Sequence, residues 1–160
     1  MAKITVKGLE EYANRIAALG KEQDRITKEA VYAGAEVIAD AIKAGLHSIP
    51  IDNGRGTPER PISGITSRQK ADLIKSFGLA PMENRDGYLQ TKAGFDGYGS
   101  TPSKKYPKGL PNALLMRSVE SGTSFRKKTP VIRKAVNSSR KRSIQAMGEC
   151  IEKACMEIME

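Results

Sequence analysis

The residues of this chain best placed to do chemistry are cations gathered in one short segment. Eight lysines and arginines fall within seventeen residues, and no acidic residue occurs between positions 121 and 147. A block of this density binds polyanions or acidic protein surfaces through charge, without making or breaking bonds. The pattern indicates a binding or assembly role for Arg126, Lys127, Lys128, Arg133, Lys134, Arg140, Lys141 and Arg142.

Side chains that could catalyse a reaction are too sparse to form a recognisable site. His47 is the only histidine, and with two cysteines it matches no zinc-ligand spacing. The segment GFDGYG at 94–99 lacks the glycine order of a dinucleotide-binding loop. The segment ESGTS at 120–124 lacks the glycine that precedes the serine of a nucleophile elbow. We therefore expect no enzymatic activity, no metal and no cofactor.

The charges near the end of the chain oppose the dipole of the helix expected there. Cations fill the first half of a helix predicted over residues 130–159, close to its positive end. Acidic residues gather near its negative end, at Glu149, Glu152, Glu157 and Glu160. Surface charges cost little and can persist without a function. Alternatively, the basic end faces a polyanion while opposite ends of neighbouring copies attract each other, and we favour this second interpretation.

Composition points to the same class of partner. The chain has 160 residues and a formal net charge of +9, which favour one domain over residues 1–160 and an anionic neighbour. That neighbour could be nucleic acid, an acidic protein or an anionic membrane, and a merely basic surface is the alternative. No apolar run is long enough for a membrane span or a secretory signal. Cys150 and Cys155 point in roughly opposed directions on one helix, so we expect a chain kept in a reducing cytoplasm.

Sequence-specific recognition of nucleic acid is not indicated. The chain carries no helix-turn-helix, RNA-recognition or zinc-finger signature, and only 5% of its residues are aromatic. Few aromatics argue against stacking on single strands. Any DNA contact would therefore be with the charged backbone alone.

Long helices are predicted at both ends of the chain. An apolar face at Leu9, Tyr12, Ile16 and Leu19 predicts a first helix, which Gly20 ends or kinks before helical periodicity resumes over 21–46. The last helix would run about 45 Å, so one end is expected to project or to pack on another subunit. Its apolar stripe comprises Ile132, Ala135, Val136, Ser139, Ser143, Met147, Cys150, Ile151, Ala154 and Ile158.

Shorter elements are predicted between these helices. A short strand is expected at 4–6. Thr66 and Gln69 have capping-box spacing, which predicts a helix to about Ser76 that stops at Gly78. Two strands of a hairpin are predicted at 79–82 and 87–95, with a turn at 83–86. A further short helix is predicted at 113–121, and Pro130 is expected at the first position of the last helix.

Two turn-rich segments are predicted to be mobile loops, at 47–65 and 94–108. The first is rich in proline and glycine and carries Arg55 and Arg60. It is either a flexible surface excursion or a loop that orders only against a partner. The second is also basic. Its candidate contacts to neighbouring proteins are Tyr98, Lys104, Lys105 and Tyr106.

These features, in this order, resemble the tailed-phage neck proteins known as the gene-product-ten family of lambda-like siphophages. The likeness covers nearly the whole chain through GLEEYANRIAALG, LHSIP, TSRQKADLIKSFGLAPM, GFDGYG and RSVESGTSFRKKTPVIRKAVN. The last piece is the most specific, because family members commonly carry a glutamate, a Gly-Thr-Ser turn and a proline before the terminal helix. Here these are Glu120, Gly122, Thr123, Ser124 and Pro130. Many relatives have a compact Asp-Thr-Gly turn where this chain has IDNGRGTPERPISGITS.

The resemblance implies an α+β fold in which long N- and C-terminal helices pack on a small antiparallel β-sheet, with extended loops. It implies a non-enzymatic head–tail joining protein that forms a homo-oligomeric ring in the virion neck, assembled in the host cytoplasm. Partners would be adjacent head-completion and tail proteins, with non-specific contact to packaged DNA and no membrane. The alternative is a stand-alone basic nucleic-acid-binding or regulatory protein.

Overall fold

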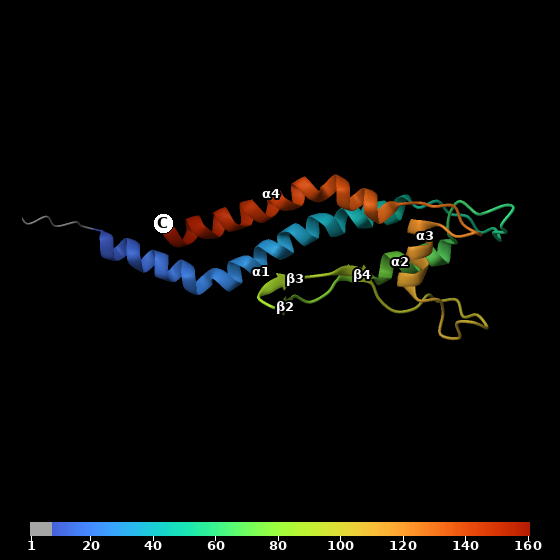
Figure 1. The fold of residues 1–160 in the computed structure, drawn as a ribbon, viewed down its shortest axis with the longest axis horizontal. Helices are drawn as coiled ribbons and strands as arrows, with labels where there is room; N and C mark the ends of the chain where they lie inside the picture. The colour runs from blue at the N-terminus through green and yellow to red at the C-terminus, as the bar shows by residue number, and fades with distance from the viewer. Residues whose placement is uncertain (1–7) are drawn as a thin grey trace, which may run out of the picture.

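Two long helices, one from each end of the chain, lie side by side over much of their length (Figure 1). The computed structural model describes residues 8–160. Helix α1 is Leu9–Ser48 and helix α4 is Val131–Met159. We call residues 9–29 and 145–160 the arm, because they extend away from the other elements (Figure 1). The remainder is the base, which contains α2 (Ser67–Ser76), α3 (Asn112–Ser121) and four short strands.

Small residues let α1 and α4 approach closely. The buried Ser143 hydroxyl of α4 donates a 2.8 Å hydrogen bond to the Gly34 carbonyl of α1. A Cβ at Gly34 would lie 2.6 Å from Cε of Met147, and one at Gly45 would lie 2.6 Å from Cγ1 of Val131. The two glycines therefore set the distance between the helices.

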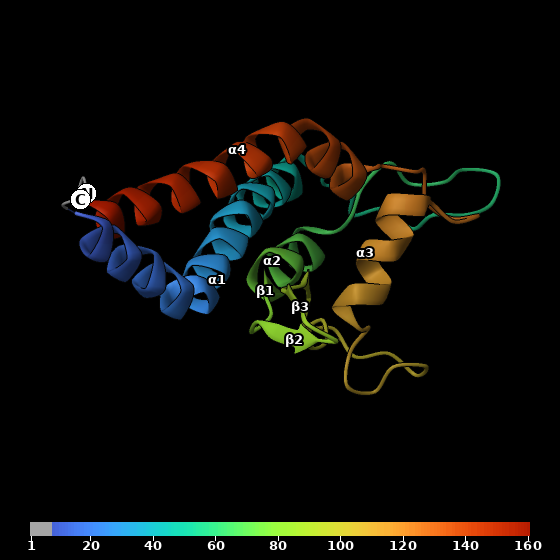
Figure 2. The same cartoon turned by 60° about the vertical axis from the view of Figure 1, so that its left-hand side comes forward.

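Helix α1 is continuous, so Gly20 does not end it. Figure 2 shows a change of direction in the N-terminal third of the helix, the part that contains Gly20. Glycine is a common site of helix bending because it lacks a Cβ and stabilises the helix least among non-proline residues. The guanidinium of Arg15 donates hydrogen bonds to Glu11 and to the carbonyl of Met159, which ties the start of α1 to the end of α4.

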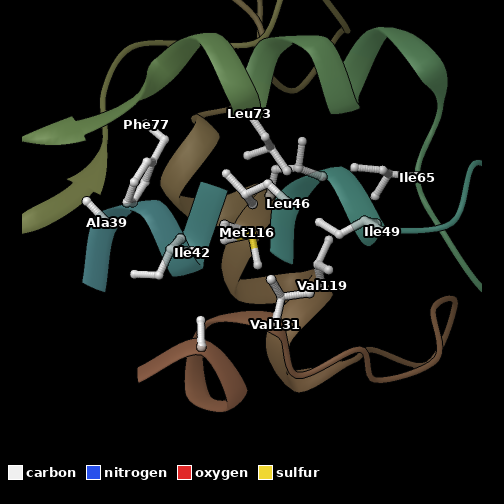
Figure 3. Packing of buried hydrophobic residues seen from close by; sticks show 12 residues of the cluster. Ala39, Ile42, Leu46, Ile49, Ile65, Leu73, Phe77, Met116, Val119 and Val131 are labelled. Carbon is white, nitrogen blue, oxygen red and sulfur yellow. The ribbon is translucent and has the colours of Figure 1, made fainter. Parts of the chain in front are cut away.

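The hydrophobic core lies in the base, where α1, α2, α3 and the start of α4 converge (Figure 3). Leu46, Leu73 and Met116 come from three different helices and are each almost completely buried. Ile49 and Ile65 join them from the two ends of the connection between α1 and α2. This cluster packs the short elements against the last turns of α1.

The capping box predicted for α2 is confirmed. The backbone amide of Gln69 donates to the Thr66 hydroxyl at 3.2 Å, and the backbone amide of Thr66 donates to the side-chain oxygen of Gln69 at 3.2 Å. The Lys70 ammonium donates to the carbonyls of His47 and Ile49 at 2.6 and 2.8 Å. These carbonyls are unpaired at the end of a helix, so Lys70 caps α1.

The hairpin exists, but its predicted turn was wrong, and of the predicted first strand at 79–82 only Leu79 lies in a strand. Strand β2 (Glu83–Arg85) pairs with β3 (Tyr88–Gln90), and β1 (Phe77–Leu79) pairs with β4 (Ala93–Phe95), both antiparallel. The turn is the dipeptide Asp86-Gly87, whose φ angles are 53° and 85°. Asp and Gly tolerate positive φ and suit a tight hairpin turn, so residues 83–85 pair instead of turning. Gly78 consequently lies within β1 and does not terminate α2.

The α+β fold class is confirmed for the described residues, although the strands form two separate two-stranded ladders. Pro130 is the residue before α4 instead of its first residue. In the predicted stripe of α4, Ala135, Ser139, Ser143 and Ala154 are buried, but Ile151 is 43% exposed. The strand predicted at 4–6 lies outside the described residues. None of the helices found in residues 8–160 is long and apolar enough to cross a membrane.

Candidate functional site

Glu120, the penultimate residue of α3, caps the N-terminus of α4. Its two carboxylate oxygens accept hydrogen bonds from the amides of Ile132 and Arg133, at 2.9 and 3.0 Å. These amides have no partner within the helix, and the N-terminus of a helix attracts negative charge. Glu120 thus supplies the anion that α4 itself lacks over its cationic first half.

The basic connector, residues 122–130, is a compact turn between α3 and α4. Gly122 has φ 75°, and a Cβ there would lie 3.0 Å from the amide nitrogen of Lys128. Thr123 and Arg126 exchange backbone hydrogen bonds of 2.9 and 3.2 Å. The amide of Thr129 donates to the carbonyl of Val119 at 2.8 Å. The glutamate, the Gly-Thr-Ser turn and the proline singled out in the sequence therefore form one structural unit that joins two helices.

The three cations of the connector are not equivalent. Arg126 is half-buried, and its guanidinium lies 3.4 Å from the Ser118 hydroxyl. Burial lowers the pKa of Arg126 below its usual range. Lys127 and Lys128 are exposed. Arg126 therefore contributes to the packing of the connector, whereas the two lysines are presented to solvent.

The cations of α4 divide between two sides of the helix. Arg133 and Arg140 are two helical turns apart, as are Lys134 and Lys141, so these four exposed residues form a strip along one side. Arg142 is also exposed, but it lies about 180° around the helix from Arg133 and therefore outside the strip. Among residues 8–160, no ion pair involves any of the eight cations.

The first predicted loop begins later than expected, because His47 and Ser48 belong to α1. Over residues 49–66 it lacks regular structure, yet it is fastened at several points. Ile62 pairs with the connector, since its amide donates to Phe125 at 3.0 Å and its carbonyl accepts from Lys127 at 2.9 Å. The Asp52 carboxylate accepts from the amides of Gly54 and Ser63, and these bonds lower its pKa. Arg55 and Arg60 lie exposed on the outer part of this loop.

The second predicted loop, beyond β4, is fastened to α2 and α3. The Asp72 carboxylate of α2 accepts from the amide and the hydroxyl of Ser100, at 2.8 and 2.9 Å. The buried Asn112 side chain donates to the carbonyl of Asp96 at 2.9 Å. Tyr98, Lys104 and Lys105 are exposed and Tyr106 is half-buried, with Lys105 Nζ 5.7 Å from the centre of its ring.

Both loops and the connector lie at the end of the molecule opposite the arm (Figures 1 and 2). The fold brings the loop of Arg55 and Arg60 against the connector of Lys127 and Lys128 through the Ile62 pairing. The loop of Tyr98 connects β4 to the start of α3 and lies apart from the connector. The strip on α4 begins beside the connector and runs toward the arm. The predicted contacts therefore occupy one end of the molecule without forming a single cluster.

The residues considered for catalysis stay apart. His47 is exposed near the end of α1, and Cys150 and Cys155 are free and half-buried on α4. Within residues 8–160, no three histidine, cysteine, aspartate or glutamate side chains come together as metal ligands.

Sequence reasoning did not predict the contacts of Asp52 and Asp72, and it named Glu120 in the family motif without predicting its capping role. Asp52, Asp72 and Glu120 each accept two hydrogen bonds from distant or neighbouring segments. Two signals were available. Asp52-Asn53-Gly54 is a turn sequence in which an aspartate commonly accepts from the amide two residues on. Glu120 is the last acidic residue before the cationic block.

Comparison with family models, curated proteins and solved structures finds no match to this chain.

Proposed function

We propose that this protein is a non-enzymatic structural subunit of a tailed bacteriophage or prophage virion, and that it forms part of the neck ring joining the DNA-filled head to the tail. The resemblance of the segment from Glu120 to Pro130 to the neck family suggests this class. The structure adds a physical reason for the segment, because it is the capped turn that orients α4.

The observation that best supports a subunit of an assembly is the large surface of the isolated chain. Its accessible surface is 11534 Å², whereas a compact monomer of its mass, 17.4 kDa, exposes roughly 7,900 Å². An isolated chain gains little stability from an arm that buries so little of its own surface. Packing against neighbouring subunits would bury that surface.

Exposed apolar side chains along the arm support the same conclusion. Leu9, Tyr12 and Ile16 of α1 are 65, 55 and 49% exposed, and Met156 of α4 is 62% exposed. Leu9, Tyr12 and Ile16 belong to the apolar helical face that the sequence predicted, and about half or more of each side chain stays uncovered within residues 8–160. A row of large apolar residues on a solvent-facing helix is typical of an interface with another protein.

The cations would then act at the basic end of each subunit. Lys127, Lys128 and the α4 strip are exposed and have no ion-pair partner among the described residues. In a ring, each position would be repeated in every subunit, which concentrates positive charge on one surface. That surface would face packaged DNA or an acidic partner ring, and the two loops would contact neighbouring neck or tail proteins.

Electron microscopy of particles from a phage or prophage lacking this gene tests the proposal. Filled heads and separate tails should accumulate side by side. Complementation with a Lys127→Ser, Lys128→Ser variant should restore less joining than the wild-type gene, because the variant lacks two of the cations that would contact DNA or an acidic partner ring. Both lysines are exposed, so the variant should still fold. A Lys75→Ser, Arg85→Ser variant removes the same charge from exposed positions outside the connector and both loops, and this matched control should restore joining as well as the wild-type gene does. Intact, joined virions from the deletion would refute the neck role.

The rival function, a stand-alone nucleic-acid-binding protein, predicts a different result with the purified chain. Tight DNA binding that weakens steeply with salt would favour the rival, since each neutralised phosphate adds to the salt dependence. A neck subunit should bind free DNA weakly, because its charges act together only in a ring.

A further inference from the structure

An apolar groove lies on the arm between the N-terminal part of α1 and the C-terminal part of α4. It has a volume of about 390 Å³, and the residues that line it include Ile16, Leu19, Gln23, Ile26, Ile151 and Cys155. Ile16 and Ile151 are 49 and 43% exposed, although both are branched aliphatic residues. The backbones of α1 and α4 stand apart on the arm (Figure 2), whereas Gly34 packs closely on Met147 nearer the base.

The opposite end of the molecule presents an aromatic side chain on a rigid support. Phe125 is 52% exposed at the tip of the connector. Its amide donates to the Thr123 hydroxyl at 3.2 Å, and its carbonyl accepts from Ile62 at 3.0 Å. Hydrogen bonds to its amide and its carbonyl therefore fix the backbone at Phe125, so docking its exposed ring elsewhere costs little backbone entropy.

The charges around these two features are complementary. Lys127 and Lys128 follow Phe125 closely and are exposed. Asp24 and Glu152 each follow a groove-lining residue by one position, are exposed, and make no ion pair within residues 8–160. More broadly, the arm carries nine acidic and five basic side chains, whereas residues 121–142 carry eight cations and no acid. Opposite charges at the two ends favour head-to-tail contact and disfavour contact between like ends.

From these observations we infer that the groove on the arm is the docking site for a second copy of this chain, which inserts Phe125 between α1 and α4. Lys127 and Lys128 of the incoming copy then lie near Asp24 and Glu152 of the receiving copy. An aromatic anchor in an apolar groove with charged residues at the rim is the usual arrangement of a protein interface.

The contact uses different surfaces on the two copies, so each copy keeps one free groove and one free Phe125. Contacts of this kind generate rings when the rotation between copies closes, and open filaments when it does not. The inference rests on the ring component of the proposed function and specifies which surfaces would make that ring.

Disulfide trapping with the full-length protein tests the contact directly. In a Cys150→Ser background Cys155 is the only native thiol, and it lines the groove. A Ser124→Cys substitution places a second thiol beside Phe125 without removing the anchor. Oxidation should link this thiol to Cys155 of another copy and give a ladder of covalent oligomers, with the linked peptides identified by mass spectrometry.

Two controls decide what a ladder means. Thr101→Cys puts an exposed thiol on the other loop of the same end and should give at least tenfold less product. Adding Phe125→Ala to the Ser124→Cys protein should abolish the ladder, since the anchor is lost. A product that persists without Phe125, or that joins Cys155 to Cys155, would overturn the inference.

A mixing experiment tests whether the contact is head-to-tail. Phe125→Ala removes the anchor, and Ile151→Lys places a cation in the groove of an otherwise intact copy. Each variant alone should remain monomeric in sedimentation velocity at the highest soluble concentration, whereas wild type associates. An equimolar mixture should form dimers and nothing larger, because one intact groove and one intact Phe125 remain. A wild-type protein that stays monomeric, or a mixture that stays monomeric while wild type associates, would refute the contact.

Charge exchange provides the final check. Lys127→Glu with Lys128→Glu should weaken association, as should Asp24→Lys with Glu152→Lys. Combining all four substitutions in one chain should restore association if these groups face each other. If these experiments show no contact between copies, the neck role is still decided by the gene deletion. Joined virions after deletion would in turn leave the measured self-contact unaffected.

Discussion

A single carboxylate couples the last two helices of this protein. Glu120 belongs to α3, but both of its oxygens are bound to amides at the start of α4. The same helix start carries Arg133 and Lys134, which its dipole disfavours. Capping from a neighbouring element resolves this conflict without placing an acid in the cationic segment.

Removal of this cap should destabilise the fold. Glu120→Ala is expected to lower the free energy of unfolding by about 1–2 kcal/mol, because two amides of α4 lose their acceptor. Urea unfolding followed by circular dichroism measures the change. Glu157→Ala, on the exposed end of the same helix, is the control and should change stability by only a few tenths of a kcal/mol. Equal stability of the two variants would contradict the capping role.

Asp52 provides a local dependence on pH. Hydrogen bonds from Gly54 and then Ser63 are the main causes that hold its pKa below the usual range. A carboxylate with a lowered folded-state pKa stabilises the fold above its unfolded pKa, and the effect is lost as pH falls through the folded-state value. The loop at 49–66 should therefore loosen below about pH 4.

Two-dimensional NMR over an acid titration measures this change through the amide signals of Gly54 and Ser63. These signals should shift together with the Asp52 carboxyl. Asp52→Asn should remove the titration from both amides, whereas Asp24→Asn should leave it intact. Amide shifts that persist in Asp52→Asn would show that another group controls the loop.

At the scale of elements, the packing of α1 on α4 depends on positions without side chains. Gly34 faces Met147, and the Ser143 hydroxyl bonds to the Gly34 carbonyl. Glycine normally weakens a helix, so its presence in the middle of α1 is offset by the close approach that it permits. Gly148 in α4 differs, because nothing lies within 4 Å of the Cβ it lacks.

Alanine at these two glycines should therefore act in opposite directions. Gly34→Ala is expected to destabilise the protein by about 1–3 kcal/mol through overpacking against Met147. Gly148→Ala should stabilise it by about 0.5–1 kcal/mol, as alanine does in an open helical position. Thermal unfolding of the two variants measures both changes. Stabilisation by Gly34→Ala would mean that Met147 moves aside freely and that the helices are loosely packed.

At the scale of the whole molecule, the structure is an extended arm on a small base. The core lies in the base, while large apolar residues remain exposed along the arm. Helix α1 alone, with 40 residues, follows a path of about 60 Å. A chain of this length would have a radius of gyration of roughly 15 Å if it were compact.

Small-angle X-ray scattering of the monomeric Phe125→Ala variant tests this shape. The radius of gyration should clearly exceed roughly 15 Å, because the arm places mass far from the base. Removal of residues 1–7 provides a control, and the radius of gyration of the shortened chain should still clearly exceed roughly 15 Å. A compact value would contradict the extended arm and, with it, the argument that neighbouring subunits cover its surface.

The sequence by itself determined the helices, the α2 cap and the cationic block. These features depend on local periodicity, capping residues and charge, and all three are readable without a partner segment. The Asp86-Gly87 turn was also readable, but it was placed three residues too early. Only the tertiary structure decided that Glu120 caps α4, that Arg126 packs inward and that Ile62 pairs with the connector. Each depends on residues separated in the chain and brought together by the core. The exposed groove on the arm was also decided only by the tertiary structure. An apolar helix face in the sequence shows that the face needs a partner, and only the fold shows whether another segment of the chain covers it.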